Sequence, residues 1–524
     1  MENTTFSEPN YGSYYTAVQL MLPMDISKKI DENDPVVSFA EAMKGLDLRS
    51  YVKKSVHRGN QGYDPYMMLN IMLFAEMEGK HSDLREIEKL CRTDVRYMWL
   101  SHENTPSHMA FQRFEQKYLK KSIKDIFFEI TGHLANLMEI DVSRQYIDGT
   151  KFVANAYKNS FVYKTRVVNA RSRLWSNITE IIILLNQEFG FNFPYHDQYC
   201  AQEIGYIVQY LMEVMVKENT EITYGKGKRK SLIQRYYDKL LTYAIKLDEY
   251  EWNLFICGDR NSYSKTDHDA TMMNTKYDYY NKTGVSSPCY NVQHGVSDGL
   301  VMNVGIYQTP GDTKTFIPFM EQGAEYYGFF PLWAVTDAGY GGYDNYFFCI
   351  ENGIELGMKY NYYAKKNEKQ FKKKQYNAMN WKKNEDGYKI CPAGNVFDIL
   401  LTEKYDETGR YLKINQIYGC EGCSECERKN QCTKSKRRTI TVNPINEEFQ
   451  MIVDHNLGTE QGKEMKKQRS VQAEGVFGII KQDRLYTRIK RRGLENVEME
   501  IFKVYIGYNL MKYHKYCQSQ KHAA

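Results

Sequence analysis

The sequence lacks any apolar run long enough to cross a membrane. The stretch Ile181 to Leu185 is far shorter than the roughly 20 residues that a spanning helix needs. The first residues, Met1-Glu-Asn-Thr-Thr-Phe6, are polar, and no basic region followed by an apolar one marks a signal peptide. These absences lead us to expect a cytoplasmic protein with no membrane partner.

A strong excess of one charge is also missing. The chain of 524 residues carries 70 Lys and Arg against 65 Asp and Glu, a net charge of +5. This balance permits nucleic-acid binding without requiring it. Whether the chain binds nucleic acid therefore depends on where its basic residues cluster. A hydrophobic fraction of 42% and a mean hydropathy of -0.62 are typical of globular proteins. The length exceeds one compact core, so several domains or one interrupted domain are expected.

Residues 1–37 are expected to form a polar N-terminal arm and residues 38–140 an all-α domain. The segment Tyr66 to Phe74 is apolar on nearly all sides, which predicts a buried helix entered through Asp64-Pro65. Further short helices are predicted after Ser82 and after Pro106. A helix-turn-helix DNA-binding role and a simple packing role are both open for this domain.

Two predicted strands run into acids. The apolar run Leu332 to Val335 is followed by Asp337 and then by a glycine-rich turn, and the chain from Asn345 has helical spacing. A second strand, from Val142 to Ile147, is expected to end at Asp148. Taken alone, Asp337 is better explained as a cap of the helix that follows it.

The remaining elements predict an α/β fold over residues 141–515, with 516–524 as a tail. A hairpin at 290–307, a helix at 316–325 and a strand at 354–360 complete a mixed five-stranded sheet flanked by helices. The sheet is expected to be interrupted by a helical insertion at about 165–260 and a basic, Cys-rich β insertion at about 361–460. This order is that of an RNase H-like sheet, in which the first and fourth strands are neighbours.

A third acid lies on a predicted helix over residues 461–483. Glu474 and Lys481 are seven residues apart, nearly two turns, and so share one face. Taken without a motif, Glu474 is better explained as a solvated side chain. The basic segment from Arg484 to Arg492 follows the helix and suits DNA contacts.

Four short motifs, taken together, resemble the signatures of DDE transposases of bacterial insertion sequences, over about residues 40–515. They are Asp148-Gly-Thr-Lys151, Tyr290-Asn-Val-Gln293, Asp337-Ala-Gly-Tyr340 and Glu474-Gly-Val-Phe-Gly-Ile-Ile-Lys481. The resemblance implies that Asp148, Asp337 and Glu474 hold Mg²⁺ or Mn²⁺ ions in an RNase H-like core. It implies cleavage at element ends and strand transfer into target DNA.

The resemblance also implies partners and contacts. The partners are double-stranded DNA, as terminal inverted repeats and as target, and a second copy of the chain bound with it, in a nucleoid-associated setting. The expected DNA-binding residues are Lys151, Arg469, Lys481, Arg488 and Arg492. One departure stands out: related transposases have a Tyr and an Arg at fixed offsets before the Glu, where this chain has Lys467 and Ser470, with Arg469 one position away.

A cysteine cluster lies inside the second insertion. Cys420, Cys423, Cys426 and Cys432 have spacings that could close on one tetrahedral Zn²⁺ in a structural role, with Cys391 as a substitute ligand. The alternative is a reduced, packed loop.

Two other functions remain open at this stage. One is a DNA-binding regulator derived from a transposase that no longer catalyses. The other is a metal-dependent nuclease that cuts DNA without strand transfer.

Overall fold

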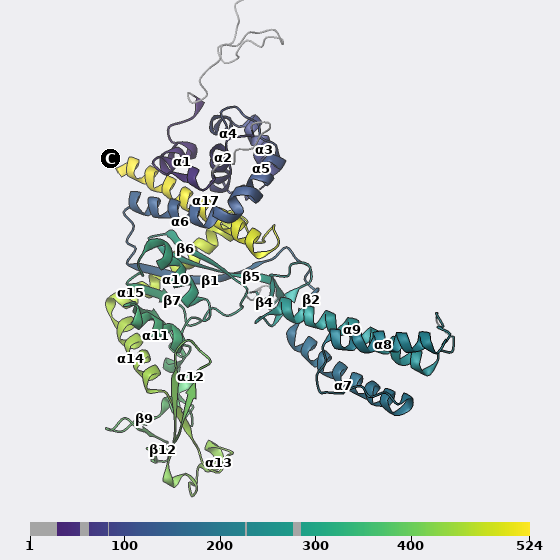
Figure 1. The fold of residues 1–524 in the computed structure, drawn as a ribbon. Helices are drawn as coiled ribbons and strands as arrows, with labels where there is room; N and C mark the ends of the chain where they lie inside the picture. The colour runs from purple at the N-terminus through teal and green to yellow at the C-terminus, as the bar shows by residue number, and fades with distance from the viewer. Residues whose placement is uncertain (1–28, 53–61, 82, 226–227, 276–284, 524) are drawn as a thin grey trace, which may run out of the picture.

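A mixed sheet of six strands lies at the centre of the molecule (Figure 1). The computed structural model describes residues 29–52, 62–81, 83–225, 228–275 and 285–523, so residues 1–28 of the predicted arm lie outside it. The strand order is β4-β5-β1-β7-β8, and β6 also pairs with β5. The strands are β1 Arg144–Val153, β4 Thr271–Asn274, β5 Ser286–Ser297, β6 Leu300–Tyr307, β7 Trp333–Thr336 and β8 Glu355–Met358.

The predicted α/β class with a mixed sheet is confirmed, with one strand more than the five expected. The extra strand is β4, which pairs with the first residues of the long strand β5. Strands β7 and β8 are parallel to β1, whereas β5 is antiparallel to both β1 and β6.

The first acid does not end its strand, although the sequence pattern predicts that it does. Pairing between β1 and β7 reaches Tyr146 and Val335, but β1 continues to Val153 because β5 goes on pairing with it as far as Cys289. Asp148 therefore lies where β1 loses one of its two neighbours. Continuing the parallel register by two residues sets Asp148 level with Asp337.

Helices from the start of the chain cover one face of the sheet (Figure 1). As predicted, α2 begins at Pro65, and the Asp64 carboxylate accepts the N–H of Tyr66 at 2.7 Å. Asp83 caps α3, because its carboxylate accepts the N–H of Glu86, while Ser82 lies outside the described residues. The helices are α1 Pro35–Met43, α2 Pro65–Met77, α3 Leu84–Thr93, α4 Val95–Leu100, α5 His108–Phe114 and α6 Lys120–Leu137, with the π-helical turn η3 Glu115–Leu119 before α6.

The last helix, α17 (Leu494–Ala523), is buried between these helices and the sheet. It continues through the segment predicted as a tail. A Cβ on Gly507 would lie 2.4 Å from the carbonyl carbon of Glu76, so α17 passes close to α2. Lys503 of α17 is fully buried and pairs with Glu115, which also pairs with Arg491. The front helices thus share one core with the end of the chain.

Helices α10 (Phe316–Tyr327), α11 (Tyr343–Glu351) and α14 (Pro444–Gly458) share a second core with β8 and the centre of β1. The predicted helix over 461–483 is present as α15 (Glu460–Arg469), η7 (Ser470–Glu474), α16 (Gly475–Gly478) and η8 (Ile479–Asp483), with η7 and η8 π-helical. The hydroxyl of Thr459 caps it by accepting the N–H of Gly462 at 3.0 Å.

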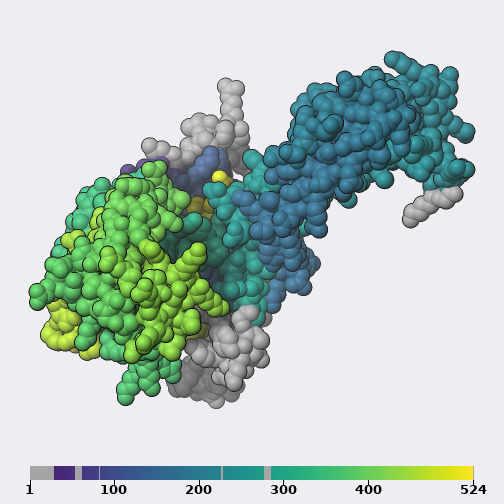
Figure 2. Space-filling view, turned by 90° about the horizontal axis from the view of Figure 1, so that it is seen from below, coloured from purple at the N-terminus to yellow at the C-terminus, as the bar shows by residue number. Residues whose placement is uncertain are grey.

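Two insertions leave the sheet in different directions (Figure 1). The first is an arm of three helices with a core of its own, which stretches away from the body (Figure 2). It consists of α7 Lys164–Phe189, α8 Ala201–Lys217 and α9 Leu232–Cys257, with β2 Phe161–Tyr163 and β3 Ser262–Ser264 at its base. The second contains η4 Lys365–Asn367, α12 Lys369–Lys372, η5 Ala378–Asn380, β9 Lys382–Lys383, β10 Lys389–Ile390, β11 Val396–Phe397, β12 Ile399–Asp406, β13 Lys413–Gly419, η6 Glu421–Cys423, α13 Lys429–Cys432 and β14 Ile440–Val442.

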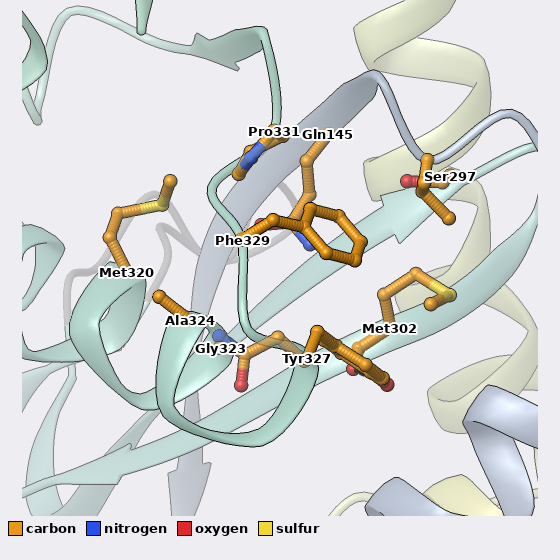
Figure 3. A pocket seen from close by; sticks show the side chains of 11 residues that line it. Gln145, Ser297, Met302, Met320, Gly323, Ala324, Tyr327, Phe329 and Pro331 are labelled. Atoms are coloured by element: carbon orange, nitrogen blue, oxygen red, sulfur yellow. Dashed lines mark hydrogen bonds between the residues drawn. The ribbon is translucent and has the colours of Figure 1, made fainter. Parts of the chain in front are cut away.

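A small cavity lies at the start of β1, away from the acids. Figure 3 shows Tyr327, Phe329 and Met302 lining it, beside Gln145. Its volume of about 20 Å³ holds one water molecule at most, so it is a packing defect and not a ligand site. Among the described residues, no helix combines the length and the apolar character that a membrane span requires.

Candidate active site

The three predicted acids come from three different elements. Asp148 is buried in β1, and its carboxylate accepts the N–H of Gly149 at 2.9 Å. Asp337 directly follows β7, and its carboxylate accepts the N–H of Gly339 at 2.8 Å. Glu474 is the last residue of η7, and half of its side chain is exposed.

The guanidinium of Arg469 lies between two of these acids. Its Nη1 is 3.6 Å from Oδ2 of Asp148, and its Nη2 is 2.9 Å from Oε1 of Glu474. In the ranges that the structure describes, no three His, Cys, Asp or Glu side chains form a group that could hold a metal ion. The sequence predicts a DNA contact for Arg469, and in the structure this residue is the cation that two of the acids share.

Two further side chains connect Asp337 to the same neighbourhood. Burial raises the pKa of Tyr340 well above its usual range, and the charges of Asp312, Asp148 and Asp337 raise it further. Burial also lowers the pKa of Lys359, as does Arg469, while Asp337 and Glu474 act in the opposite direction. All three acids therefore act on one local electrostatic environment.

The glycine-rich turn after Asp337 has a steric role. A Cβ on Gly341 would lie 2.3 Å from the carbonyl oxygen of Lys359, so only glycine fits beside the backbone that follows β8. Tyr340, next to this glycine, is almost fully buried in the second core.

The helix that carries Glu474 is held to β5 by His294, a residue that sequence reasoning missed. The Nε2 of His294 is 3.0 Å from the carbonyl oxygen of Ala473, and its ring stacks on Phe477. In the β1–β5 pairing, His294 stands opposite Asp148. One buried side chain thus connects the strand position of the first acid with the backbone next to the third.

Lys481 anchors the same helix to β1. Its ammonium donates to Oγ1 of Thr150 at 2.7 Å and to the carbonyl oxygen of Lys151 at 3.2 Å, and it lies 4.5 Å from the ring centroid of Phe152. Its predicted contact with a DNA phosphate remains a prediction.

A fourth carboxylate, Asp312, was also missed as a site residue. Its Oδ1 accepts hydrogen bonds from Lys151 at 3.0 Å, from Asn291 at 2.8 Å and from Gln293 at 3.0 Å. Gln293 in turn accepts from the Tyr340 hydroxyl. The signal was present in the Tyr290-Asn-Val-Gln293 motif, whose two amides meet this acid, but no residue spacing announced Asp312 itself.

Arg488 and Arg492 lie elsewhere. Arg488 bridges to Val153 at the far end of β1, and its Nε is 3.4 Å from the Ala154 carbonyl oxygen. Arg492 donates to the carbonyl oxygen of Asn155 at 2.6 Å. Both arginines thus contact the backbone at and just after the end of β1, and their predicted contacts with DNA remain predictions.

The cysteines of the second insertion surround one cavity. Cys391, Cys423, Cys426 and Cys432 line it, and Cys420 is buried nearby. Burial, followed by the neighbouring Cys423, raises the pKa of Cys420 to about 12. Three of the four predicted thiols thus border one cavity together with Cys391, although in the part of the chain that the structure describes they do not yet form a group that could hold a metal ion.

Comparison with known proteins gives two matches. Residues 390–514 match a family model described as a transposase DDE domain, and residues 24–117 match one described as a transposase domain (DUF772). No curated protein and no solved structure matches the chain. The two models cover different parts of the chain, at its start and near its end, and both support a transposase, which implies an enzyme of the polynucleotidyl transferase type that acts on DNA.

Proposed function

We propose that this chain is a metal-dependent transposase of a bacterial insertion sequence, which cleaves the strands at element ends and transfers them into target DNA. The observation that carries the proposal is the parallel register of β1 and β7, which sets Asp148 and Asp337 at one level. The helix of Glu474 packs across β1 beside them through Lys481. The strand order also supports an RNase H-like core, since β1 lies between the antiparallel strand β5 and the parallel strand β7.

Asp148, Asp337 and Glu474 are the residues that would hold Mg²⁺ or Mn²⁺. The charges of these residues fit a metal ion, because two of the carboxylates already contact one cationic group, the Arg469 guanidinium. When bound, such ions activate the attacking oxygen and stabilise the leaving oxygen of a phosphodiester. The chain itself supplies positioning: His294 and Lys481 hold the helix of Glu474 on the sheet, and the Asp312 network holds Lys151.

A cleavage and joining assay tests this proposal. The substrate is a duplex from the end of the DNA element that encodes the chain, with a supercoiled plasmid as target, with Mg²⁺ or with EDTA. Asp337→Asn should abolish both steps, while Asp141→Asn should not, because Asp141 precedes β1 and its carboxylate accepts the N–H of Ser143. Cutting without joining would favour the nuclease, and DNA binding without any metal-dependent chemistry would favour the silent regulator. Because a transposase joins two ends of its element, we also expect two copies of the chain on the DNA. Light scattering would measure the mass of that complex.

The cysteine cavity supports a second, structural metal site. We infer that Zn²⁺ binds among Cys391, Cys420, Cys423, Cys426 and Cys432, because four of these thiols line one cavity although they come from two separate segments. Metal analysis of the purified chain should find about one zinc per chain, and Cys423→Ser should lose it. A metal-free wild-type chain that melts at the same temperature with and without zinc would contradict this.

A further inference from the structure

A basic groove lies at the far end of β1, outside the candidate active site. It encloses about 630 Å³ between the end of α2 and the segment after η8. Lys80 and His81 follow α2, Arg488 and Lys490 belong to the segment after η8, and Asn155 also lines the groove. The basic side chains Lys80, Arg488 and Lys490 outnumber the single acid, Asp83, while the Arg484 guanidinium is turned into the wall. Such a surface complements a polyanion.

The walls of the groove are rigidly joined. The buried guanidinium of Arg484 donates to the carbonyl oxygens of Glu76 and Met77, both at 3.1 Å. His81 reaches the carbonyl oxygen of Arg484 at 2.8 Å, and the Lys490 ammonium donates to that of His81 at 2.9 Å. The groove is therefore a built surface and not an accidental gap between loops. Its two walls belong to the two stretches that match transposase domains.

One apolar side chain stands at the rim in an unusual conformation. Leu485 has φ of +55°, a left-handed conformation that is costly for a leucine, and 79% of the residue is exposed. An exposed, strained leucine beside cationic side chains gains nothing from the isolated fold. Strain of this kind is commonly kept where a ligand is bound, and apolar side chains are used against the sugars and base steps of DNA grooves.

The position of the groove relative to the acids is set by β1. Asp148 and Val153 are five residues apart on that strand, which is about 17 Å at the usual rise of a β-strand. Val153 bridges to Arg488. Since B-DNA rises about 3.4 Å per base pair, this separation corresponds to about five base pairs for a duplex whose axis runs along β1.

We propose that this groove binds duplex DNA of the element's end, about five base pairs from the bond on which the acids act. Lys80, Arg488 and Lys490 contact phosphates, and Leu485 packs against the sugar edge. This inference rests on the proposed function, because it takes the DNA to be the substrate of that same site. It assigns DNA contact to the seam between the front helices and the end of the chain, whether or not the front helices also form a helix-turn-helix.

Fluorescence anisotropy over a series of salt concentrations tests the groove. The probes are a 30-base-pair duplex from the element's end and a random duplex, with the full-length chain in EDTA so that no cleavage interferes. Arg488→Gln combined with Lys490→Gln should lower the slope of log K against log salt by about 1.8, since each phosphate contact contributes about 0.9. Leu485→Gly should weaken binding severalfold and leave the slope unchanged, because it removes no charge.

The matched control is Arg235→Gln combined with Lys239→Gln on α9, two basic residues of the arm, which should leave the slope at the wild-type value. A wild-type slope in the groove variant, with wild-type affinity in Leu485→Gly, would overturn the inference. Circular dichroism of each variant excludes loss of fold, and Leu485→Gly also relieves backbone strain. If the slope falls as expected but the wild type cleaves no DNA with Mg²⁺, the groove stands and the proposed function fails. If the wild type cleaves DNA but the slope is unchanged, the proposed function stands and the groove fails.

Discussion

The imidazole of His294 lies flat on the ring of Phe477, with ring centroids 3.7 Å apart and planes inclined by 11°. His294 is completely buried on β5, and Phe477 follows Glu474 by three residues on the helix that crosses the sheet. Its two nitrogens contact the Ala473 carbonyl oxygen at 3.0 Å and the Tyr505 hydroxyl at 3.2 Å. The buried imidazole therefore holds the helix that carries Glu474 against β5.

Replacing His294 with phenylalanine should separate stacking from hydrogen bonding. The aromatic contact is kept, but the Ala473 carbonyl and the Tyr505 hydroxyl each lose a partner, which costs about 1–3 kcal/mol for each buried group. We expect a lower urea midpoint and a slower joining rate with little change in KM for DNA. Phe128→Leu, far from the acids, provides a comparison for general loss of stability. An unaltered joining rate at full folding would show that His294 does not position Glu474.

The same residue should make stability depend on pH. Burial lowers the pKa of His294 to about 3, whereas a histidine in the unfolded chain has a pKa of about 6.5. Between these two values the unfolded state binds a proton that the folded state does not, so the free energy of unfolding falls as the pH falls. The slope is about 1.4 kcal/mol per pH unit. Urea unfolding from pH 7 to pH 4 should show a shallower loss in His294→Phe, and parallel curves would contradict the assignment.

Arg469 should compete with metal ions for the acids. Its guanidinium is within 4 Å of both Asp148 and Glu474, where a divalent cation would be repelled by it. Arg469→Gln should therefore bind Mn²⁺ at least about tenfold more tightly, equivalent to about 1.4 kcal/mol. Electron paramagnetic resonance of free Mn²⁺ measures this. Lys467→Gln, an exposed change on the same helix, should leave the affinity as it is, and equal affinities in all three proteins would exclude the competition.

Much of the sheet could be predicted because its signals are local. The hairpin at 290–307 is present as β5 and β6, and the run into Asp337 is β7, since alternation and an Asp298-Gly299 turn depend only on nearby residues. The end of β1 could not be predicted in this way. Whether a strand continues past Asp148 depends on the length of its partner β5, about 140 residues further along the chain, which no local pattern records.

The same distinction between local and remote contacts applies to the candidate active site. Motifs led to the prediction of Asp148, Asp337 and Glu474, although nothing in their spacing indicated that Arg469 would contact two of them. Asp312 and His294 were missed because each acts through contacts between elements remote in sequence, such as the 161 residues that separate Asp312 from Lys151. Side chains whose role is to hold other side chains leave little periodic signal.

Asp312 should matter for both stability and chemistry. Its Oδ1 accepts hydrogen bonds from Lys151, Asn291 and Gln293. Asp312→Asn keeps the shape of the side chain but removes the negative charge that faces the partly buried Lys151 ammonium. We expect a loss of about 2 kcal/mol in the free energy of unfolding, discounted for partial exposure, together with slower DNA cleavage. Asp386→Asn on an exposed loop is the control, because that carboxylate accepts a hydrogen bond from its neighbour Asn384. A variant that melts at the same temperature as the wild type would show that Asp312 is not needed to hold Lys151, Asn291 and Gln293 in place.

The buried charges that join the front helices to α17 should dominate the stability of that seam. Glu115 is fully buried and receives both Lys503 and Arg491, so Glu115→Gln removes the anion that these two cations share. Breaking a buried pair from one side costs about 3–5 kcal/mol. Glu115→Gln combined with Lys503→Met should cost less than the two single changes added together, because one of the two cations that face the neutral amide is then gone too. The surface pair of Lys120 and Glu495 offers the contrast: Glu495→Gln should leave the urea midpoint close to the wild-type value, because water screens the exposed Glu495 carboxylate. Urea unfolding of the four variants measures these changes in the free energy of unfolding. If the double variant loses as much as the two single variants together, Glu115 and Lys503 do not stabilise each other.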